Sequence, residues 1–246
     1  MSRIACVFAF CITLLAVGTL EAAEKQNGPR FRPAVLGSGP DALINRIDPD
    51  ALLKKRQKDA AVMFCAIVSE TGHAIGGWTY RGTPESDALV DEVEKRLMGV
   101  KFTPPIYNHQ PAKVLIYGTV LFNPVEKPHV WIFLNQDPQE LKRRSDFIAP
   151  QPVIGVDSKF RGLHPPAGVP IAISGFAGIN LKVDATGVLQ NLEVINEEPP
   201  LLGFAAATYE DFEGAKFIPA FRSGDPADSN TMMIVCYKAD EIGTTE

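Results

Sequence analysis

The stretch VSETGHAIGGWTYRGTPESDALVDEVEKRLMGVKFTPPIYNHQPAKVLIYGTVLF, residues 68–122, decides the fold of this chain of 246 residues, because a version of it occurs twice. Residues 183–237 read VDATGVLQNLEVINEEPPLLGFAAATYEDFEGAKFIPAFRSGDPADSNTMMIVCY, and the two stretches align without a gap at an offset of 115 residues. Eleven of the 55 aligned positions are identical, whereas chance at ordinary composition gives about three or four. We infer a duplicated domain.

Each copy predicts the same order of elements: a strand, a tight turn, a return strand, a helix and a last strand. In the first copy these are strand 62–69, turn 70–73, strand 74–80, a helix 87–98 capped by Ser86, and strand 113–122. In the second copy they are strand 179–183, turn 184–187, strand 188–195, helix 201–213 and strand 231–237. One more helix, capped by Asp48 with Pro49 at its first position, precedes the first copy.

This order constrains the topology of each copy. The first two strands form a hairpin, and the helix crosses back to the third strand. A right-handed crossover places the first strand in the centre and the third strand at an edge, with the helix on one face. The predicted fold class is therefore α+β, with two tandem domains that each contain a three-stranded antiparallel sheet with helices on one face.

The motifs of both copies resemble the C-terminal domain of TonB. In the second copy they are Val183-Asp184-Ala185-Thr186-Gly187, Lys216-Phe217-Ile218-Pro219-Ala220 and Asp225-Pro226. In the first copy they are Val68-Ser69-Glu70-Thr71-Gly72, Lys101-Phe102-Thr103-Pro104-Pro105 and Gln110-Pro111. The resemblance covers about half of the chain and rests on the order and spacing of motifs that occur twice. It divides the chain into domains at 46–123 and 166–240, joined by a linker at 124–165 that contains a short helix from Asp137 to Arg144.

The resemblance implies a periplasmic domain that binds a protein partner, such as an outer-membrane receptor, by strand addition. In this mode a segment of the partner pairs with an exposed sheet edge. The candidate edges are the two third strands, 113–122 and 231–237. The candidate binding residues on them are Val114, Ile116, Gly118, Val120, Met232, Ile234 and Cys236. The competing interpretation is that each edge pairs within the protein or is covered against aggregation.

Residues 1–23 have the layout of a secretory signal peptide: a positive start at Arg3, an uncharged apolar run from residue 4 to 20, and small residues at Ala22 and Ala23. The competing interpretation is a retained membrane anchor, because the run is at the lower limit of what spans a bilayer. Only a retained leader would place the protein at the membrane. A cleaved leader, and the lack of a long proline-rich spacer, depart from an energy-transducing TonB.

Export leaves Cys65 and Cys236 as the two cysteines of the processed chain. In an oxidising compartment they are candidates for a disulfide that ties the two copies together, and two buried free thiols are the alternative. Cys65 lies on a second apolar face of strand 62–69, with Met63 and Ile67. A strand that is apolar on both faces is usually buried on both. The candidates to cover that face are the second domain, the connecting segment and a partner. We favour the connecting segment, with its apolar run 130–134, over a partner.

The sequence predicts no enzyme and no cofactor. The four histidines, His73, His109, His129 and His164, lie in predicted turns or beside prolines, without the spacing of a zinc site or a catalytic triad. The acidic pairs Glu197-Glu198 and Glu210-Asp211 are interpreted as solvated faces. Trp78 and Tyr80 are interpreted as residues of core or inter-domain packing, with a binding face as the alternative. The net charge of −5 gives no electrostatic footprint for nucleic acid.

Three hypotheses for the function follow. The first is a non-enzymatic periplasmic binding or adaptor protein that recognises extended peptides or receptor segments. The second is a membrane-anchored, atypical TonB-type accessory of outer-membrane transport. The third is a structural envelope protein whose two domains bind each other. Cleavage of the leader distinguishes the first from the second, and exposure of the third-strand edges distinguishes the first from the third.

Overall fold

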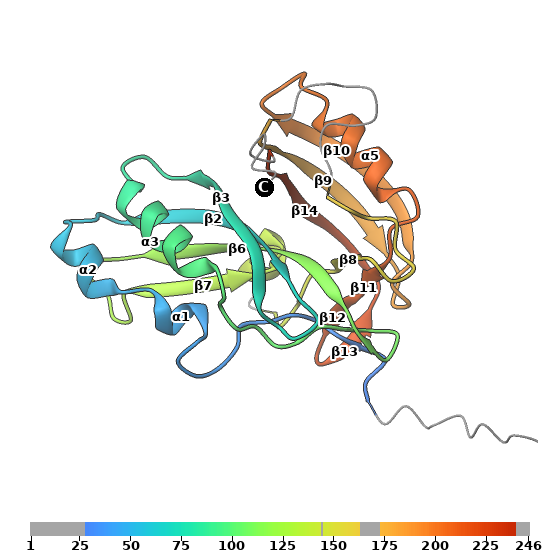
Figure 1. The fold of residues 1–246 in the computed structure, drawn as a ribbon, viewed down its shortest axis with the longest axis horizontal. Helices are drawn as coiled ribbons and strands as arrows, with labels where there is room; N and C mark the ends of the chain where they lie inside the picture. The colour runs from blue at the N-terminus through green and yellow to red at the C-terminus, as the bar shows by residue number, and fades with distance from the viewer. Residues whose placement is uncertain (1–27, 144, 163–172, 240–246) are drawn as a thin grey trace, which may run out of the picture.

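The computed structural model describes residues 28–143, 145–162 and 173–239 (Figure 1). The fold is α+β, with several antiparallel sheets and few helices. The predicted signal peptide at 1–23 lies outside the described residues. No helix in the described part of the chain is both long and apolar enough to cross a bilayer.

The first unit is formed by β2 (Ala60–Val68), β3 (Ala74–Gly82), α3 (Asp87–Leu97) and β6 (Lys113–Phe122). The order of its strands is β3-β2-β6, all antiparallel, with the first strand in the centre as predicted. The helices α1 (Leu43–Arg46), α2 (Pro49–Lys54) and α3 pack together on one side of this sheet (Figure 1). Asp48 caps α2 as predicted, because its carboxylate accepts the Ala51 N–H at 3.0 Å.

The second unit repeats this arrangement with β9 (Gly175–Val183), β10 (Leu189–Glu198), α5 (Phe204–Phe212) and β14 (Ser229–Tyr237), in the order β10-β9-β14. In Figure 1, α5 lies on the side of this sheet that faces away from the first unit. The two units match in detail at the offset of 115 residues. Their second strands carry extra, bulged residues at equivalent positions, Ile75 and Tyr80 in β3 and Gln190 and Ile195 in β10.

The repeated Thr-Gly and Lys-Phe motifs are explained by one close contact in each unit. Gly72 and Gly187 have φ of +86° and +83°, and a Cβ on either would collide with the carbonyl oxygen of Phe102 or Phe217. Each glycine carbonyl also accepts the N–H of that phenylalanine, at 2.8 and 3.1 Å. A glycine is therefore required at the turn for both its backbone conformation and its lack of a side chain.

Two helix starts differ from the prediction. Ser86 makes no side-chain cap; instead the amide oxygen of Gln57 accepts the Leu89 N–H at 3.1 Å, so a residue distant in sequence caps α3. The last helix begins at Phe204 rather than at Leu201. Leu201 and Gly203 have positive φ, at +62° and +84°, which is incompatible with a right-handed helix, and Leu201 is 93% exposed.

The linker is more structured than predicted. It contains β7 (Val130–Leu134), the expected short helix as α4 (Pro138–Lys142), and β8 (Gln151–Ile154). Asp137 caps α4 by accepting the N–H groups of Gln139 and Glu140 at 2.8 and 3.2 Å. The remaining short strands are β1 (Phe31–Arg32), β4 (Ile106–Tyr107), β5 (Gln110–Pro111), β11 (Phe217–Ile218), β12 (Ala220–Arg222) and β13 (Asp225–Ala227).

The apolar run 130–134 does not cover the second face of the first sheet, contrary to our expectation. It forms β7 and pairs with β6, and so widens the sheet instead. The second face is covered mainly by the second unit: Cys65, Leu115 and Tyr117 belong to the same buried cluster as Phe176 and Cys236, together with Phe147 and Ala149 of the linker. Tyr80 packs on Phe176 with ring centroids 5.2 Å apart, so it serves packing between the units, as predicted.

Cys65 and Cys236 form a disulfide in the structure, with their Cα atoms 6.4 Å apart. The bond joins the central strand of the first unit to β14 of the second unit. Its two cysteines are separated by 171 residues.

We predict that the double variant Cys65→Ser/Cys236→Ser lowers the free energy of unfolding by about 2–5 kcal/mol, because the bond closes a long loop in the unfolded chain. Denaturant titration of the oxidised protein measures this loss. The wild-type protein under reducing conditions is the matched control and should unfold at the same denaturant concentration as the variant. Two free thiols in the non-reduced processed chain would contradict the pairing.

Candidate functional site

The predicted binding residues of the first unit do not lie on a free edge. In an antiparallel sheet the main-chain N–H and C=O groups of successive residues point alternately to the two neighbouring strands. Ser69 donates its N–H to the His73 carbonyl at 2.9 Å, so the odd-numbered residues of β2 face β3 and the even-numbered ones face β6. The even-numbered residues of β6 therefore turn their N–H and C=O groups toward β2. Those residues are the four predicted ones, Val114, Ile116, Gly118 and Val120, which pair with Val68, Ala66, Phe64 and Val62.

The outer side of β6 is also occupied. β7 pairs with residues 118–122 and β8 with Lys113 and Val114. Between them, Tyr117 donates its N–H to the Asn135 side chain at 3.1 Å and accepts the Asn135 N–H at 2.9 Å. The prediction that 113–122 is an open edge is therefore wrong, and the alternative of pairing within the protein is correct for this copy.

Gly118 has a packing role in this arrangement. A Cβ at this position would lie 2.7 Å from the Phe64 ring and 2.8 Å from a methyl carbon of Leu134. Val114, Ile116 and Val120 are fully buried in the core of the first unit. The four residues are therefore structural, and strand periodicity could not reveal this because it does not show which strand lies next to β6.

In the second unit, β14 pairs with β9 and has no strand on its other side among the described residues. The Asp184 N–H donates to the Val188 carbonyl at 3.1 Å, so the even-numbered residues of β9 face β10 and the odd-numbered ones face β14. Because Leu181 pairs with Thr231, the odd-numbered residues of β14 face β9. The outward main-chain groups belong to Asn230 and to the three predicted residues Met232, Ile234 and Cys236.

Only the first part of this edge is open. Met232 is 46% exposed, whereas Ile234 is half-buried, and Cys236, which forms the disulfide, is 2% exposed. The Tyr117 hydroxyl reaches the Met232 carbonyl at 3.4 Å. Burial raises the pKa of Tyr117, so this hydroxyl stays protonated and acts as a donor. The accessible edge therefore lies within Ser229–Met232, and its open outward groups are the N–H and C=O of Asn230 and the N–H of Met232, because the Met232 carbonyl already accepts the Tyr117 hydroxyl.

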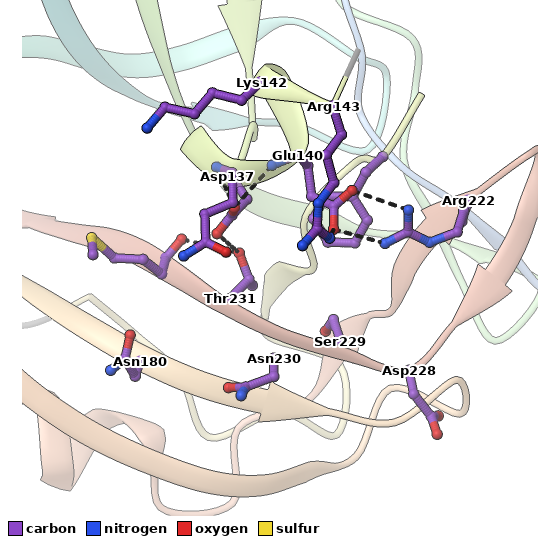
Figure 2. Close-up of a pocket in the computed structure, with 13 residues that line it drawn as sticks. Asp137, Glu140, Lys142, Arg143, Asn180, Arg222, Asp228, Ser229, Asn230 and Thr231 are labelled. Atoms are coloured by element: carbon purple, nitrogen blue, oxygen red, sulfur yellow. Dashed lines mark hydrogen bonds and ion pairs between the residues drawn. The ribbon is translucent and has the colours of Figure 1, made fainter. Parts of the chain in front are cut away.

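The open part of the edge borders a polar pocket of about 580 Å³ between β14 and α4 (Figure 2). Its charged lining residues are Asp137, Glu140, Asp228, Lys142, Arg143 and Arg222, and its uncharged polar ones include Asn180, Ser229, Asn230 and Thr231. The Asp137 carboxylate caps α4 and also accepts the Thr231 hydroxyl at 3.0 Å. That contact fixes the helix beside the strand.

Glu140 and Arg222 form an ion pair in the pocket. The two terminal guanidinium nitrogens of Arg222, Nη1 and Nη2, each donate to the Glu140 carboxylate at 3.1 Å, a bidentate geometry that favours the charged form of the carboxyl group. The Ser145 hydroxyl donates to the same carboxylate at 2.8 Å. The hydrogen bonds from Arg222 and Ser145 lower the pKa of Glu140 to about 2. The pocket therefore keeps charges of both signs near neutral pH, which suits polar or charged groups of a ligand.

The residues that the sequence interpretation set aside have structural contacts. A ring nitrogen of His73 lies 3.2 Å from the Thr71 hydroxyl, and those of His109 and His129 lie 3.1 and 2.9 Å from main-chain carbonyls. His164 lies outside the described residues. Among the described residues, no group of three or more His, Cys, Asp or Glu is placed to hold a metal ion.

The acidic pairs are only partly solvated faces. Glu198 forms an ion pair with Arg81 of the first unit. Glu197 accepts the N–H groups of Leu202 and Ala205 at 3.1 and 2.6 Å, at the start of α5. Asp211 is buried, so the interpretation of that residue as solvated is wrong.

Sequence reasoning missed most of the pocket. Asp137-Pro138 was a visible helix start, but nothing in the sequence indicated that Glu140 would meet Arg222, 82 residues away. No protein-family model matches the chain, and no curated protein or solved structure shows significant similarity to it.

We predict that Arg222→Met raises the pKa of Glu140 toward its ordinary value of 4.5, while the apolar part of the new side chain keeps contact with Phe147. In the wild type, the folded pKa lies below the ordinary one. The contact therefore stabilises the fold above about pH 4.5, and its contribution is lost as the pH falls toward 2. Carbon-detected NMR titration of the Glu140 carboxyl group measures the shift.

Arg143→Met is the matched control. Arg143 lies 3.4 Å from Glu140 and is exposed, and its charge makes the smallest contribution to the lowered pKa. A shift as large as that of Arg222→Met would contradict the role assigned to Arg222.

Proposed function

We propose that the protein is a non-enzymatic binding protein that recognises an extended segment of a partner protein by strand addition at β14. The observation that carries the proposal is the edge of β14 from Ser229 to Met232, which has no strand partner among the described residues and opens onto the polar pocket. Main-chain hydrogen bonds to the edge would supply affinity, and the charged pocket would select the side chains of the segment.

The second strands of the two units are poorer edges. β3 and β10 each contain two bulges, which twist an edge and interrupt pairing. A side chain of the following helix also occupies one outward N–H in each strand. Thr79 donates to Glu94 at 3.3 Å, and its counterpart Val194 donates to the Tyr209 hydroxyl at 3.2 Å. The pairing of β14 with β9 has no register shift, so its edge is regular.

The first unit supplies an internal example of the proposed complex. β8 lies antiparallel on β6 at Lys113 and Val114, whose counterparts at the offset of 115 residues are Asp228 and Ser229. Both counterparts line the polar pocket. A ligand strand antiparallel to β14 would take the place in the second unit that β8 takes in the first.

We further propose that the two units are tandem domains like the C-terminal domain of TonB, in a protein that is exported to the periplasm. The repeated motifs, the matching bulges and the signal-like residues 1–23 support this. A disulfide between the units is typical of an oxidising compartment. A membrane-anchored TonB-type accessory is the alternative if residues 1–23 are retained. A purely structural role has a specific observation in its favour, because the units share one buried cluster.

Met232→Pro tests strand addition. Proline removes the outward N–H of Met232 and leaves the hydrogen bonds to β9 intact. We predict that short peptides selected from a random display library on the wild-type protein bind Met232→Ala within about threefold, and bind Met232→Pro at least about tenfold more weakly. Amide hydrogen exchange of β9 should stay unchanged in both variants, which shows that the sheet is intact.

Peptides that bind Met232→Pro as well as the wild type would overturn strand addition at this edge. A library that yields no binder for the wild type would favour the structural role.

Processing of the leader is a separate test. We predict that the protein is recovered from the soluble periplasmic fraction and begins at Ala23 or Glu24, because cleavage follows the small residues. N-terminal sequencing and intact mass measure this. An intact chain that begins at Met1 or Ser2 in the inner-membrane fraction would favour the anchored alternative.

A further inference from the structure

Asn230 fixes the register of a segment that adds to β14, on the basis of the strand addition proposed above. It turns both its N–H and its C=O outward, and Met232 adds an outward N–H, whereas the Met232 carbonyl already accepts the Tyr117 hydroxyl. An antiparallel segment therefore pairs one residue with Asn230 through two hydrogen bonds and accepts a third hydrogen bond from Met232. We call the residue opposite Asn230 the central residue of the segment.

The side chain of the central residue lies on the pocket side of the sheet. Residues directly opposite each other in an antiparallel sheet place their side chains on the same face. Asn230 and Met232 line the polar pocket, as does Asn180, which pairs with Met232 on β9. Figure 2 shows Asn180 and Asn230 on the strands, with the charged side chains of α4 above them in this view. The central residue therefore shares the pocket with those charges.

The two carboxylates that α4 and its cap bring to the pocket are already bound by other donors. Asp137 accepts two N–H groups of α4 and a hydroxyl group of β14. Glu140 accepts two hydrogen bonds from Arg222 and one from the Ser145 hydroxyl. The guanidinium of Arg222 is directed at Glu140 in the same contact. These groups therefore have little capacity left for a ligand.

Two cations of the pocket lack such partners. The Lys142 side chain is exposed and makes no hydrogen bond or ion pair within the part of the chain that the structure describes. Arg143 has one contact, 3.4 Å from the engaged Glu140 carboxylate, and its side chain is 69% exposed. Lys182 lies beside the pocket, because it pairs with Asn230 and shares its face, and it too is exposed and without an ion pair among those residues. The available charged donors are therefore cationic.

We propose that the central residue of the bound segment is an aspartate or a glutamate, whose carboxylate is held by Lys142 and Arg143. Ammonium and guanidinium groups both donate charge-assisted hydrogen bonds to a carboxylate. A basic central residue would instead meet two like charges, because Asp137 and Glu140 are committed to other donors. The partner is thus a protein with an extended segment that presents an acidic side chain to this pocket.

Asp228 restricts the acidic residue to one position of the segment. It lines the pocket two residues before Asn230, and its carboxylate accepts the Ala185 N–H at 2.8 Å but forms no ion pair within the described ranges. In an antiparallel segment, Asp228 faces the residue two positions after the central one, as Lys113 faces Ile154 in the first unit. Like charges directly opposite each other are unfavourable. The preferred segment therefore has an acidic central residue and no acidic residue two positions later.

Peptides selected on the wild-type protein from a random display library, and then synthesised with amidated C-termini, test the preference by calorimetric titration. We expect the selected peptides to share one acidic residue. Replacing it by its amide should raise the Kd about three- to tenfold, as expected for exposed ion pairs with two cations. In the double variant Lys142→Gln/Arg143→Gln the same replacement should have no effect. Lys95→Gln is the matched control, because this exposed lysine lies on α3, away from the pocket, and should retain the full effect.

The outcomes separate the acidic preference from strand addition itself. Peptides that lose affinity for Met232→Pro but tolerate the amide would overturn the acidic preference and leave strand addition intact. Peptides that bind Met232→Pro as well as the wild type, or a library without binders, would overturn both. Exchanging the acidic residue with the one two positions later should weaken binding at least as much as the amide does, because the carboxylate then faces Asp228. An exchange without effect would contradict the assigned position, and an amide effect that persists in the double variant would contradict the role of Lys142 and Arg143.

Discussion

The rest of the structure depends on the burial of β2 on both of its faces. Phe64, Ala66 and Val68 pack on one side against the helices, whereas Cys65 and its neighbours need a second apolar cover. A three-stranded sheet with helices on one face cannot supply that cover. The second unit supplies most of it, by directing Phe176 and the Cys236 end of β14 onto the first sheet. The duplication therefore creates one molecule with a shared core rather than two separate copies joined by a linker.

Local features of the chain predicted the scaffold well. Apolar runs marked β2 and β6, alternating apolar residues marked β9, the glycines marked the turns, and Asp48-Pro49 marked a helix start, because each of these depends on residues close in sequence. The prediction of the edges was only half correct. It held for the part of β14 around Met232, which has no strand on its outer side among the described residues, and not for Ile234 and Cys236, which the first unit covers. It failed for β6, because β7 and β8 come from the linker, and an apolar run such as 130–134 does not indicate whether it will cover a sheet or extend it.

Two copies of one scaffold have diverged at the same place. In the first unit the outer side of the third strand is closed by β7, β8 and the Asn135 side chain. In the second unit no strand of the described residues lies on the equivalent side at Ser229–Met232, and polar residues of α4 border it. The helix that shapes this pocket belongs to the same linker that closes β6. One segment thus completes the first sheet and supplies a wall of the pocket beside the second sheet, which explains why the pocket residues come from distant parts of the sequence.

The position of the Cys65–Cys236 bond has a mechanical consequence. A pulling force on a segment attached to β14 would pass directly through this covalent bond into β2, the central strand of the other unit, rather than along the 171 residues of chain between the two cysteines. β2 pairs with β6 along its whole length and with β3 from Val62 to Val68. A load along its axis is shared by many of those hydrogen bonds at once, so the disulfide anchors a tensile load in a strand that is held on both sides.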